Sequence, residues 1–358
     1  MPDLKKKSYD HTLLATLFLI MIIGLVILYS TSAYNGEVKF HDSFYYLKKQ
    51  LFATGLGVVA MFVMAGTDYH FWKKFAIPAY LGAILLSIAV VLFGDEYNGS
   101  KRWLSLGPFS FQPSEYAKVA VILFLAYLVT RNVEKMSSIW TMLRIMLCVL
   151  PVVGLVGASN LSTAIIILGI AAVLIFVASP RYAQFIWMGV LGCGFMTVFL
   201  ALESYRLERI AIWRNPEKYE KGYQTLQGLY AIGSGGLFGR GLGESIQKLG
   251  FVPEAQNDMI FSIICEELGL VGAGFVLILF LILIWRFFVI ATHAEDLFGA
   301  LIGAGAMAHI MIQVILNISV VTNTIPNTGI TLPFISYGGT SVVFLLLEMG
   351  LVLSVSAG

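Results

Sequence analysis

Long apolar stretches separated by short polar segments run through almost the whole chain. A helix needs about 20 mostly apolar residues to cross the hydrocarbon core of a membrane. The predicted spanning helices are 12–33, 47–66, 74–93, 113–131, 142–159, 161–179, 183–202, 259–285, 297–321 and 337–356. The pattern therefore predicts an all-α integral membrane protein with ten transmembrane helices and one membrane domain, residues 1–358. A large extracellular loop, residues 203–258, is predicted between the seventh and eighth helices.

Composition supports the membrane class. Hydrophobic residues make up 58% of the chain and charged residues 12%, whereas soluble domains carry about 25% charged residues. The net charge of +2 is too small to indicate a nucleic acid as partner. The three cysteines lie in apolar stretches without metal-ligand spacing, so no disulfide framework is predicted. The first apolar stretch is long enough to span, so we interpret it as a transmembrane helix rather than a cleaved signal.

The positive charges predict the orientation, because cytoplasmic loops carry an excess of Lys and Arg. The predicted inner segments hold ten such residues and the short outer loops hold five. Both termini are therefore predicted to be cytoplasmic, and residues 94–112, 203–258 and 322–336 to lie outside. Polar residues concentrate in these three segments, so function is predicted to face outward.

The first outer segment leads into a helix through the sequence NGSKRWLSLGPFSFQPSEYAK. Pro113 suits the first turn of a helix, and Glu115 and Lys118, three residues apart, share a face. They form either an ion pair that holds the helix end or a functional pair that faces a polar cavity. Arg102 beside Trp103 either anchors the chain at the membrane interface or receives an anionic, ring-bearing head group.

The second outer segment contains the glycine-rich sequence GYQTLQGLYAIGSGGLFGRGLGE. It lacks the GxGxxG spacing and follows no strand, and the chain has no Walker pattern, so no nucleotide is predicted. We interpret it as a loop that packs closely on the membrane surface, with Arg240 and Lys248 adding positive charge. At its end, FVPEAQNDMIF places Asp258 where the eighth helix begins. Either Asp258 or Asn257 caps this helix, or Asp258 is an ionised group held at the surface for chemistry.

The third outer segment, VVTNTIPNTGITLPFISYGGTS, has two prolines and three glycines and cannot form one regular spanning helix. Such backbone is tolerated at membrane depth only within protein or along a polar cavity. Just before it, His309, Gln313 and Asn317 recur every fourth residue and share a helix face, which is typical of hydrogen bonds between helices. In the eighth helix, Glu266 and Glu267 are adjacent and cannot both face one partner.

Together these motifs resemble those of the SEDS family, the shape, elongation, division and sporulation proteins FtsW, RodA and SpoVE. The strings GSKRW, FQPSEYAK, FVPEAQNDMIFSIICEELG, NTGITLPF and SYGGTS occur in the family's order over nearly the whole chain. The sequence GPFSFQPSE is more similar to the FtsW/SpoVE branch than to RodA. The resemblance leaves open whether the protein serves division, elongation or sporulation.

The resemblance implies a ten-helix peptidoglycan glycosyltransferase in the bacterial cytoplasmic membrane. Such an enzyme polymerises lipid II into β-1,4 glycan strands on the outer face of the membrane. The implied partners are a class B penicillin-binding protein, which is a transpeptidase, and other divisome or elongasome membrane proteins. The substrate brings its own energy as an undecaprenyl diphosphate leaving group, which fits a chain without nucleotide motifs.

The resemblance also implies roles for individual residues. The family's key acid falls on Asp258, which we assign as the base that takes the proton of the acceptor hydroxyl. Lys118, Arg102 and Arg240 would offset charge on the departing diphosphate. Glu115 would orient Lys118 or help to hold a divalent cation, Mg or Mn, which is the candidate cofactor. The predicted catalytic residues are thus Asp258, Glu115 and Lys118, and the predicted substrate-binding residues are Arg102, Trp103, Arg240, Thr328 and Ser336.

The chain departs from the family between the fifth and sixth predicted helices. There the usual sequence QPDLGT is replaced by ASNLST, so the acid becomes Asn160 and the glycine becomes Ser162. A role of that acid in binding a cation does not carry over. Two other classes fit ten helices: a flippase that moves lipid II outward, and a scaffold for wall-synthesis enzymes. The outward polar clusters favour an enzyme, because a transporter needs comparable polar groups near mid-membrane or inside.

Overall fold

Nine helices in the part of the chain that the structure describes are long and apolar enough to cross a membrane. The computed structural model describes residues 9–97, 100–106, 109–181, 185–186, 189–190, 192, 194 and 210–358. The nine are α1 (His11–Phe40), α2 (Tyr45–Gly66), a unit of α3 (Tyr69–Trp72), a 3-10 turn (Lys73–Phe75) and α4 (Ala76–Phe93), α5 (Pro113–Arg131), α6 (Ile139–Ser159), α7 (Leu161–Ala178), α11 (Ile260–His293), α12 (Leu297–Val321) and α13 (Gly339–Ser356). These helices confirm the predicted class. The predicted span 183–202 lies mostly outside the described residues, so the total of ten stays a prediction.

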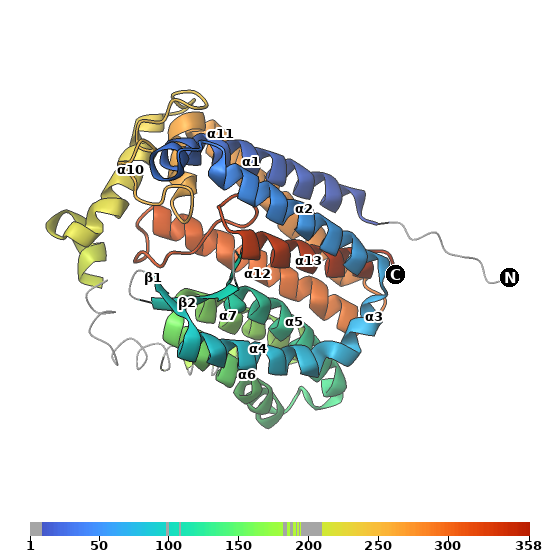
Figure 1. The fold of residues 1–358 in the computed structure, drawn as a ribbon. Helices are drawn as coiled ribbons and strands as arrows, with labels where there is room; N and C mark the ends of the chain where they lie inside the picture. Colours follow the sequence, from blue (N-terminus) through green and yellow to red (C-terminus); the bar gives the residue numbers. More distant parts are fainter. Residues whose placement is uncertain are drawn as a thin grey trace.

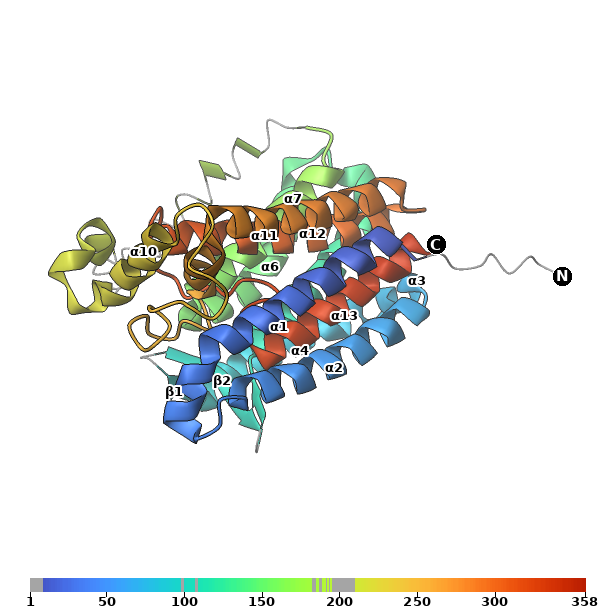
Figure 2. The same cartoon turned by 90° about the horizontal axis from the view of Figure 1, so that it is seen from above.

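The polar segments gather at one end of the helix bundle. Figures 1 and 2 show β1 (Asp95–Tyr97), β2 (Ser100–Leu106) and α10 (Tyr223–Gly235) at the end opposite to the C-terminus. At the other end, the backbone amide of Asp10 donates to Ser356 Oγ at 3.3 Å, so α1 begins beside the end of α13. The three predicted outer segments thus share one end, and the side of the membrane that this end faces stays a prediction.

A small antiparallel sheet, which the all-α prediction did not include, stands at the polar end. The strands follow the order β1-β2-β3, with β3 at Phe109–Phe111. Asp95 of β1 lies opposite Trp103 of β2. Strands as short as β1 and β3 contain too few residues for an alternation of apolar and polar positions to be recognised in the sequence. The sheet matters because its longest strand carries Arg102 and Trp103.

α5 and α12 lie at the centre of the bundle. In the most apolar 18-residue stretch of each span, 78% of the residues of α5 are buried, against 28% in the α3–α4 unit. A side chain added at Gly305 of α12 would begin 2.7 Å from Ile122 Cγ2 of α5. The two helices therefore approach more closely than a larger residue would permit, as small residues allow in membrane bundles. This contact brings the polar face of α12 beside the ion-pair candidates of α5.

α11 is broken at Gly269, whose φ of 66° and ψ of −169° are not helical. The glycine-rich loop packs against this break. Gly239 has a φ of +78°, and a side chain there would begin 2.1 Å from the carbonyl oxygen of Glu267. The amide of Arg240 donates to the carbonyl of Glu266 at 2.9 Å. The loop is closely packed, as predicted, but the surface on which it packs is α11.

Candidate active site

One face of α12 holds two loops of the polar end together. Asn317 Nδ2 donates to the carbonyl oxygens of Asp258, at 2.9 Å, and of Ile330, at 2.7 Å. One turn earlier, Gln313 Nε2 donates to the carbonyl of Thr331 at 3.0 Å. The face was predicted to bond to other helices; Gln313 and His309 do bond to α5 and α13, but these three bonds go to loops. Their effect is to fix the turn that bears Asp258 against the loop that precedes α13.

Asp258 lies in the turn before α11, with only 8% of its surface exposed. Gln224 Nε2, from α10, donates to its Oδ1 at 3.2 Å. Burial raises the pKa of this carboxyl to about 7, and the negative charge of Glu254 also raises it. The hydrogen bond from Gln224 and the positive charge of Arg102 lower the same pKa. A carboxyl whose pKa lies near neutral pH is well matched to general-base catalysis.

Neither Asp258 nor Asn257 caps α11. The helix starts at Ile260, its N-cap residue is Met259, and no side chain bonds to the cap. Asn257 Nδ2 donates instead to Glu254 Oε2 at 3.1 Å. The capping prediction was therefore wrong, because the chain enters the helix through a turn stabilised within itself. The carboxylate of Asp258 is consequently not used to hold the helix end.

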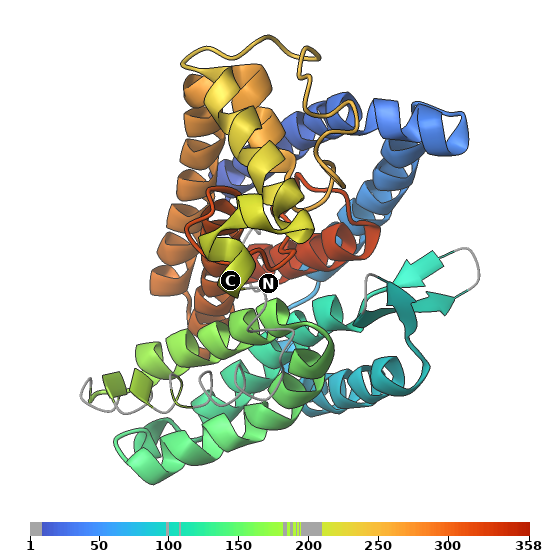
Figure 3. The same cartoon turned by 90° about the vertical axis from the view of Figure 1, so that its left-hand side faces the viewer.

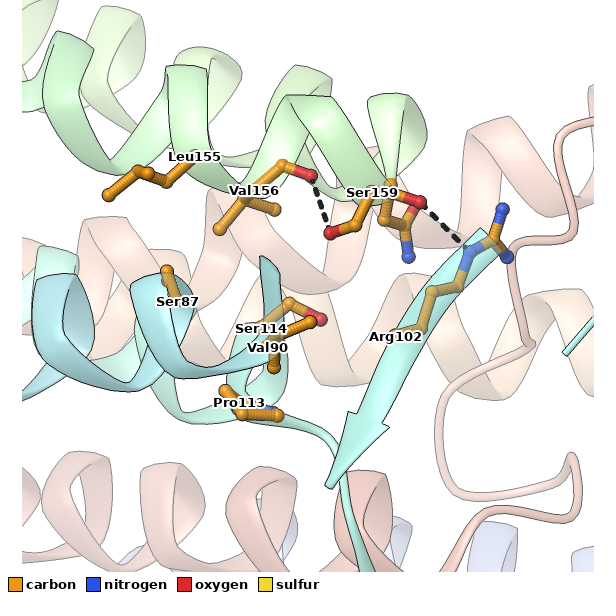
Figure 4. Close-up of a pocket in the computed structure, with 9 residues that line it drawn as sticks. Ser87, Val90, Arg102, Pro113, Ser114, Leu155, Val156 and Ser159 are labelled. Carbon is orange, nitrogen blue, oxygen red and sulfur yellow. Dashed lines mark hydrogen bonds between the residues drawn. The ribbon is translucent and has the colours of Figure 1, made fainter. Parts of the chain in front are cut away.

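Arg102 and Asp258 face the same space. A side chain added at Gly329, where φ is +70°, would begin 3.8 Å from Arg102 Nη1 and 3.9 Å from Asp258 Oδ2. Arg102 Nε donates to the carbonyl of Ser159 at 3.1 Å, which fixes the guanidinium from the other side (Figure 4). Because glycine has no side chain, room is left between a guanidinium and a carboxylate. We refer to this room as the central space.

A small pocket lies beside Arg102, between α4, α5 and α6. Its walls include Ser87, Ser114, Val156 and Ser159 (Figure 4). Its volume of about 10 Å³ is enough for roughly one water molecule. The hydroxyls of Ser87 and Ser114 are buried and have no hydrogen-bond partner among the described residues, so water is the ligand that suits it. The pocket is too small for a sugar or a diphosphate.

The segment that departs from the family pattern lies against the central space. Asn160 Oδ1 accepts a hydrogen bond from the amide of Thr163 at 3.2 Å and so caps α7. An aspartate would accept the same bond, so the substitution preserves this structural role. Ser162 Oγ donates to the carbonyl of Thr328 at 3.0 Å, a bond that glycine could not make. The hydroxyl of Thr328 is buried without a hydrogen-bond partner among the described residues.

Glu115 and Lys118 form a buried ion pair in the first turns of α5. Lys118 Nζ lies 3.1 Å from Glu115 Oε1, and the two side chains are 1% and 8% exposed, respectively. Lys118 Nζ also donates to Gln313 Oε1 at 3.0 Å. Gln313 and Asn317 are four residues apart, a rise of about 6 Å along α12. Successive turns of α12 therefore hold Lys118 and the backbone of Asp258, and Glu115 is held through Lys118.

The hydrogen-bond network continues deeper into the bundle than sequence analysis indicated. His309 Nε2 lies 3.0 Å from Gln313 Oε1, and His309 Nδ1 lies 2.7 Å from Glu348 Oε2 of α13. All three side chains are buried. A carboxylate within a membrane helix needs a polar partner. The presence of Glu348 in an apolar helix therefore indicated that some polar side chain binds it. The sequence did not show that His309 is that partner.

The adjacent acids of α11 have different partners, as their positions required. Glu266 Oε1 lies 3.8 Å from Arg240 Nε. Glu267 Oε1 lies 2.7 Å from Lys248 Nζ, and Ser30 Oγ of α1 donates to the same carboxylate oxygen at 2.7 Å. Both cations of the glycine-rich loop thus bind α11. The predicted contact of Arg240 with substrate stays a prediction.

Two further predicted substrate residues occupy different environments. Trp103 is half-buried on β2. Ser336 is buried, its Oγ accepts a hydrogen bond from the amide of Leu332 at 2.8 Å, and its carbonyl accepts one from Gln50 at 3.3 Å. Ser336 therefore stabilises the turn before α13. Its predicted contact with substrate, like that of Trp103, stays a prediction.

The described side chains do not by themselves make a site for a divalent cation. They include no group of three or more His, Cys, Asp or Glu that could hold a metal ion. Glu115, the predicted holder, has Lys118 Nζ 3.1 Å from its Oε1, and this ammonium takes the place that a cation would occupy. Mg²⁺ and Mn²⁺ require several oxygen ligands. The Mg or Mn cofactor stays a prediction.

The fold and the site define a multi-pass membrane protein with a buried carboxylate and buried cations at one end of its helix bundle. The sequence profile of the FtsW/RodA/SpoVE family, described as cell cycle proteins, matches residues 10–358. The chain belongs to this family.

Relatives match the chain over almost its full length. Stage V sporulation protein E of Bacillus subtilis (strain 168) is 41% identical over 365 residues, which cover 98% of each chain. A probable peptidoglycan glycosyltransferase FtsW of Geobacter sp. (strain M18) is 35% identical over 98% of this chain and 97% of its own. A chain from a peptidoglycan synthase complex that coordinates polymerization and crosslinking has a TM-score of 0.83 at 30% identity, covering 98% of each chain. The resemblance to the family is thus confirmed.

Proposed function

We propose that the protein is a peptidoglycan glycosyltransferase that polymerises lipid II into β-1,4 glycan strands on the outer face of the bacterial cytoplasmic membrane. The observation that carries the proposal is the central space, where Asp258 Oδ2 and Arg102 Nη1 lie 3.9 Å and 3.8 Å from the side-chain position of Gly329. A base and a cation facing one space are what a sugar transfer from a diphosphate requires. The names of relatives such as FtsW support this activity.

The reaction joins two lipid-linked sugars. The acceptor is the 4-hydroxyl of the N-acetylglucosamine of one lipid II, and the donor is the terminal N-acetylmuramic acid of the growing strand. Asp258 takes the hydroxyl proton as the oxygen bonds to the donor's anomeric carbon. The bond from that carbon to the diphosphate breaks, and undecaprenyl diphosphate leaves with the electron pair. General-base help of this kind typically contributes about 10²–10⁴-fold to the rate.

The cations stabilise charge on the leaving group. Arg102 is fixed by its bond to Ser159 and points into the central space. Lys118 is positioned by Glu115 and Gln313, one turn of α12 below the turn that bears Asp258. Preorganised cations in a site that excludes water act more strongly than they would in bulk solvent. Glu115 thus acts as a positioning residue for Lys118.

The cellular setting follows from the same proposal. The termini lie in the cytoplasm, the polar end faces outward, and a class B penicillin-binding protein crosslinks the product. The likeness to a chain of a peptidoglycan synthase complex supports such a partner. Lipid II arrives from the outer leaflet, so its lipid tails can stay in the bilayer while its sugars reach Asp258.

One assay separates an enzyme from a flippase or a scaffold. Purified protein, with and without its penicillin-binding partner, receives labelled lipid II in detergent, where no bilayer exists to be crossed. We expect glycan strands from the wild type and none from Asp258→Asn, with both proteins folded and bound to the partner to the same extent. Strands of wild-type amount from Asp258→Asn would refute the assigned base. No strands from the wild-type complex would leave transport or scaffolding as the function.

A further inference from the structure

A pocket of about 670 Å³ opens in the outer segment around the start of α10. Its walls come from residues 216–226, with Pro253 added from the turn before α11. Two 3-10 turns, Pro216–Lys218 and Glu220–Gly222, shape it. Ligand pockets in proteins typically measure about 300–1,000 Å³. The pocket therefore has room for a ligand of a few sugar rings, and none of the catalytic roles above uses it.

The pocket adjoins the assigned base. Gln224 lines it, and Gln224 Nε2 donates both to Asp258 Oδ1 and to the carbonyl of Pro253, each at 3.2 Å. Asn327 Nδ2 in turn donates to Gln224 Oε1 at 3.1 Å, which fixes the amide. A ligand in the pocket and a group at Asp258 are thus separated by one side chain. In Figure 1, α10 lies at the end of the helix bundle where α11 begins, and Figure 3, which looks onto that end, shows α10 in front of the spanning helices.

The lining combines aromatic rings with charges of both signs. Tyr219 and Tyr223 are 41% and 43% exposed. A tyrosine ring offers a large flat apolar face and a polar hydroxyl, which suits a pyranose ring with its C–H faces and peripheral hydroxyls. The charged residues of the pocket, all exposed, are Glu217, Lys218, Glu220 and Lys221. They suit a sugar chain that carries peptides with free carboxylates and amines.

We propose that this pocket binds the growing glycan strand just behind its reacting end, an inference that rests on the proposed function. Of the two reactants, the acceptor is a single lipid-linked disaccharide whose lipid stays in the bilayer. The donor strand has its anomeric carbon at Asp258, and its earlier sugars extend away from the membrane. The pocket is lined by the start of α10, which lies at the end of the bundle (Figure 1). With that end facing outward, as proposed above, the strand is the reactant that reaches it. By holding the strand between additions, Tyr219 and Tyr223 set how many units are added before release.

Strand length is the readout that tests this role. Tyr219→Ala/Tyr223→Ala, in complex with the penicillin-binding partner, receives labelled lipid II, and strand length and lipid II consumption are measured together. We expect strands shorter by about two- to tenfold per ring removed, since each lost ring contact speeds release. Tyr219→Phe/Tyr223→Phe keeps both rings and should restore the length. Tyr230→Ala is the matched control, because Tyr230 is 57% exposed on the same helix and does not line the pocket.

The outcomes separate this inference from the proposed function. A variant that merely misfolds yields less product of unchanged length, so wild-type length from Tyr219→Ala/Tyr223→Ala overturns the inference while polymerisation by the wild type still stands. If the wild type makes no strands, the proposed function itself fails. Whether the pocket binds a strand is then tested by measuring, through fluorescence anisotropy, the binding of a lipid-free oligosaccharide that bears peptides. Equal affinity of the wild type and the alanine variant would overturn it, and weaker binding by the variant would support it.

Discussion

Acidification should switch off this protein around neutral pH, because Asp258 can accept a proton only when it is ionised. Burial raises the pKa of its carboxyl to about 7. The base form is present above this pKa and is lost as pH falls through it. About 9% of the carboxyl is ionised at pH 6, half at pH 7 and about 91% at pH 8. The rate should therefore rise about tenfold between pH 6 and pH 8. A carboxyl with an unshifted pKa would be ionised throughout, and its profile would be flat.

Neighbouring substitutions should move this profile in opposite directions. Glu254→Gln removes a negative charge that raises the pKa of Asp258, so the rise in rate should move to lower pH. Gln224→Leu removes a hydrogen bond that favours the carboxylate, so the rise should move to higher pH. A purely structural role for Gln224 would lower the rate at every pH without moving the midpoint.

The assay measures initial rates of glycan formation from labelled lipid II between pH 5.5 and 8.5, a range of about three units around the expected midpoint. Ionic strength stays constant, and the rate is normalised to folded complex at each pH. The Asp258→Asn variant gives the residual rate without the base at each pH. A flat wild-type profile, or a midpoint that the two substitutions leave in place, would refute the assignment of Asp258 as the titrating base.

Three stability predictions follow, each measured by thermal unfolding in detergent. Lys118→Met leaves Glu115 buried without its cation and should cost about 3–5 kcal/mol, most of which Glu115→Gln/Lys118→Met should recover; equal instability of both variants would contradict the ion-pair reasoning. Asn160→Ala should cost about 1 kcal/mol by removing the cap of α7, whereas Asn160→Asp should be neutral. Gly239→Ala should cost at least about 1 kcal/mol because its φ is +78° and its side chain would begin 2.1 Å from a backbone oxygen, whereas Gly233→Ala, with open space around it, should not destabilise.

The sequence predicted the membrane-spanning helices well because each of them is a long, mostly apolar stretch. The span at 113–131 has the same bounds as α5, and Pro113 occupies its first turn as expected. The pairing of Glu115 with Lys118 was also readable, since residues three apart meet on a helix. The face formed by Gln313 and its neighbours was readable for the same reason, whereas the segments that it binds were not.

The contacts that make the site arise between residues far apart in the chain. Gln224 lies 34 residues before Asp258, and no spacing rule links a glutamine in one helix to a turn before another. Gly329 lies in the motif NTGITLPF, whose sequence gives no indication of the residues that surround it. Its position between Arg102 and Asp258 becomes visible only when three segments are folded together. The capping prediction for Asn257 was wrong for the same reason. It assumed that α11 begins directly after Asn257 or Asp258, whereas the helix begins at Ile260.

Because the loop around Gly239 packs against the break in α11, we expect these two segments to have evolved together. Neither the loop around Gly239 nor the helix around Gly269 has space for a side chain at the crossing. A substitution that changes the backbone of one segment must therefore be matched by a change in the other. Chimeras between relatives should exchange residues 236–270 as a block. A crossover inside this block would pair a loop with a helix shaped for a different loop.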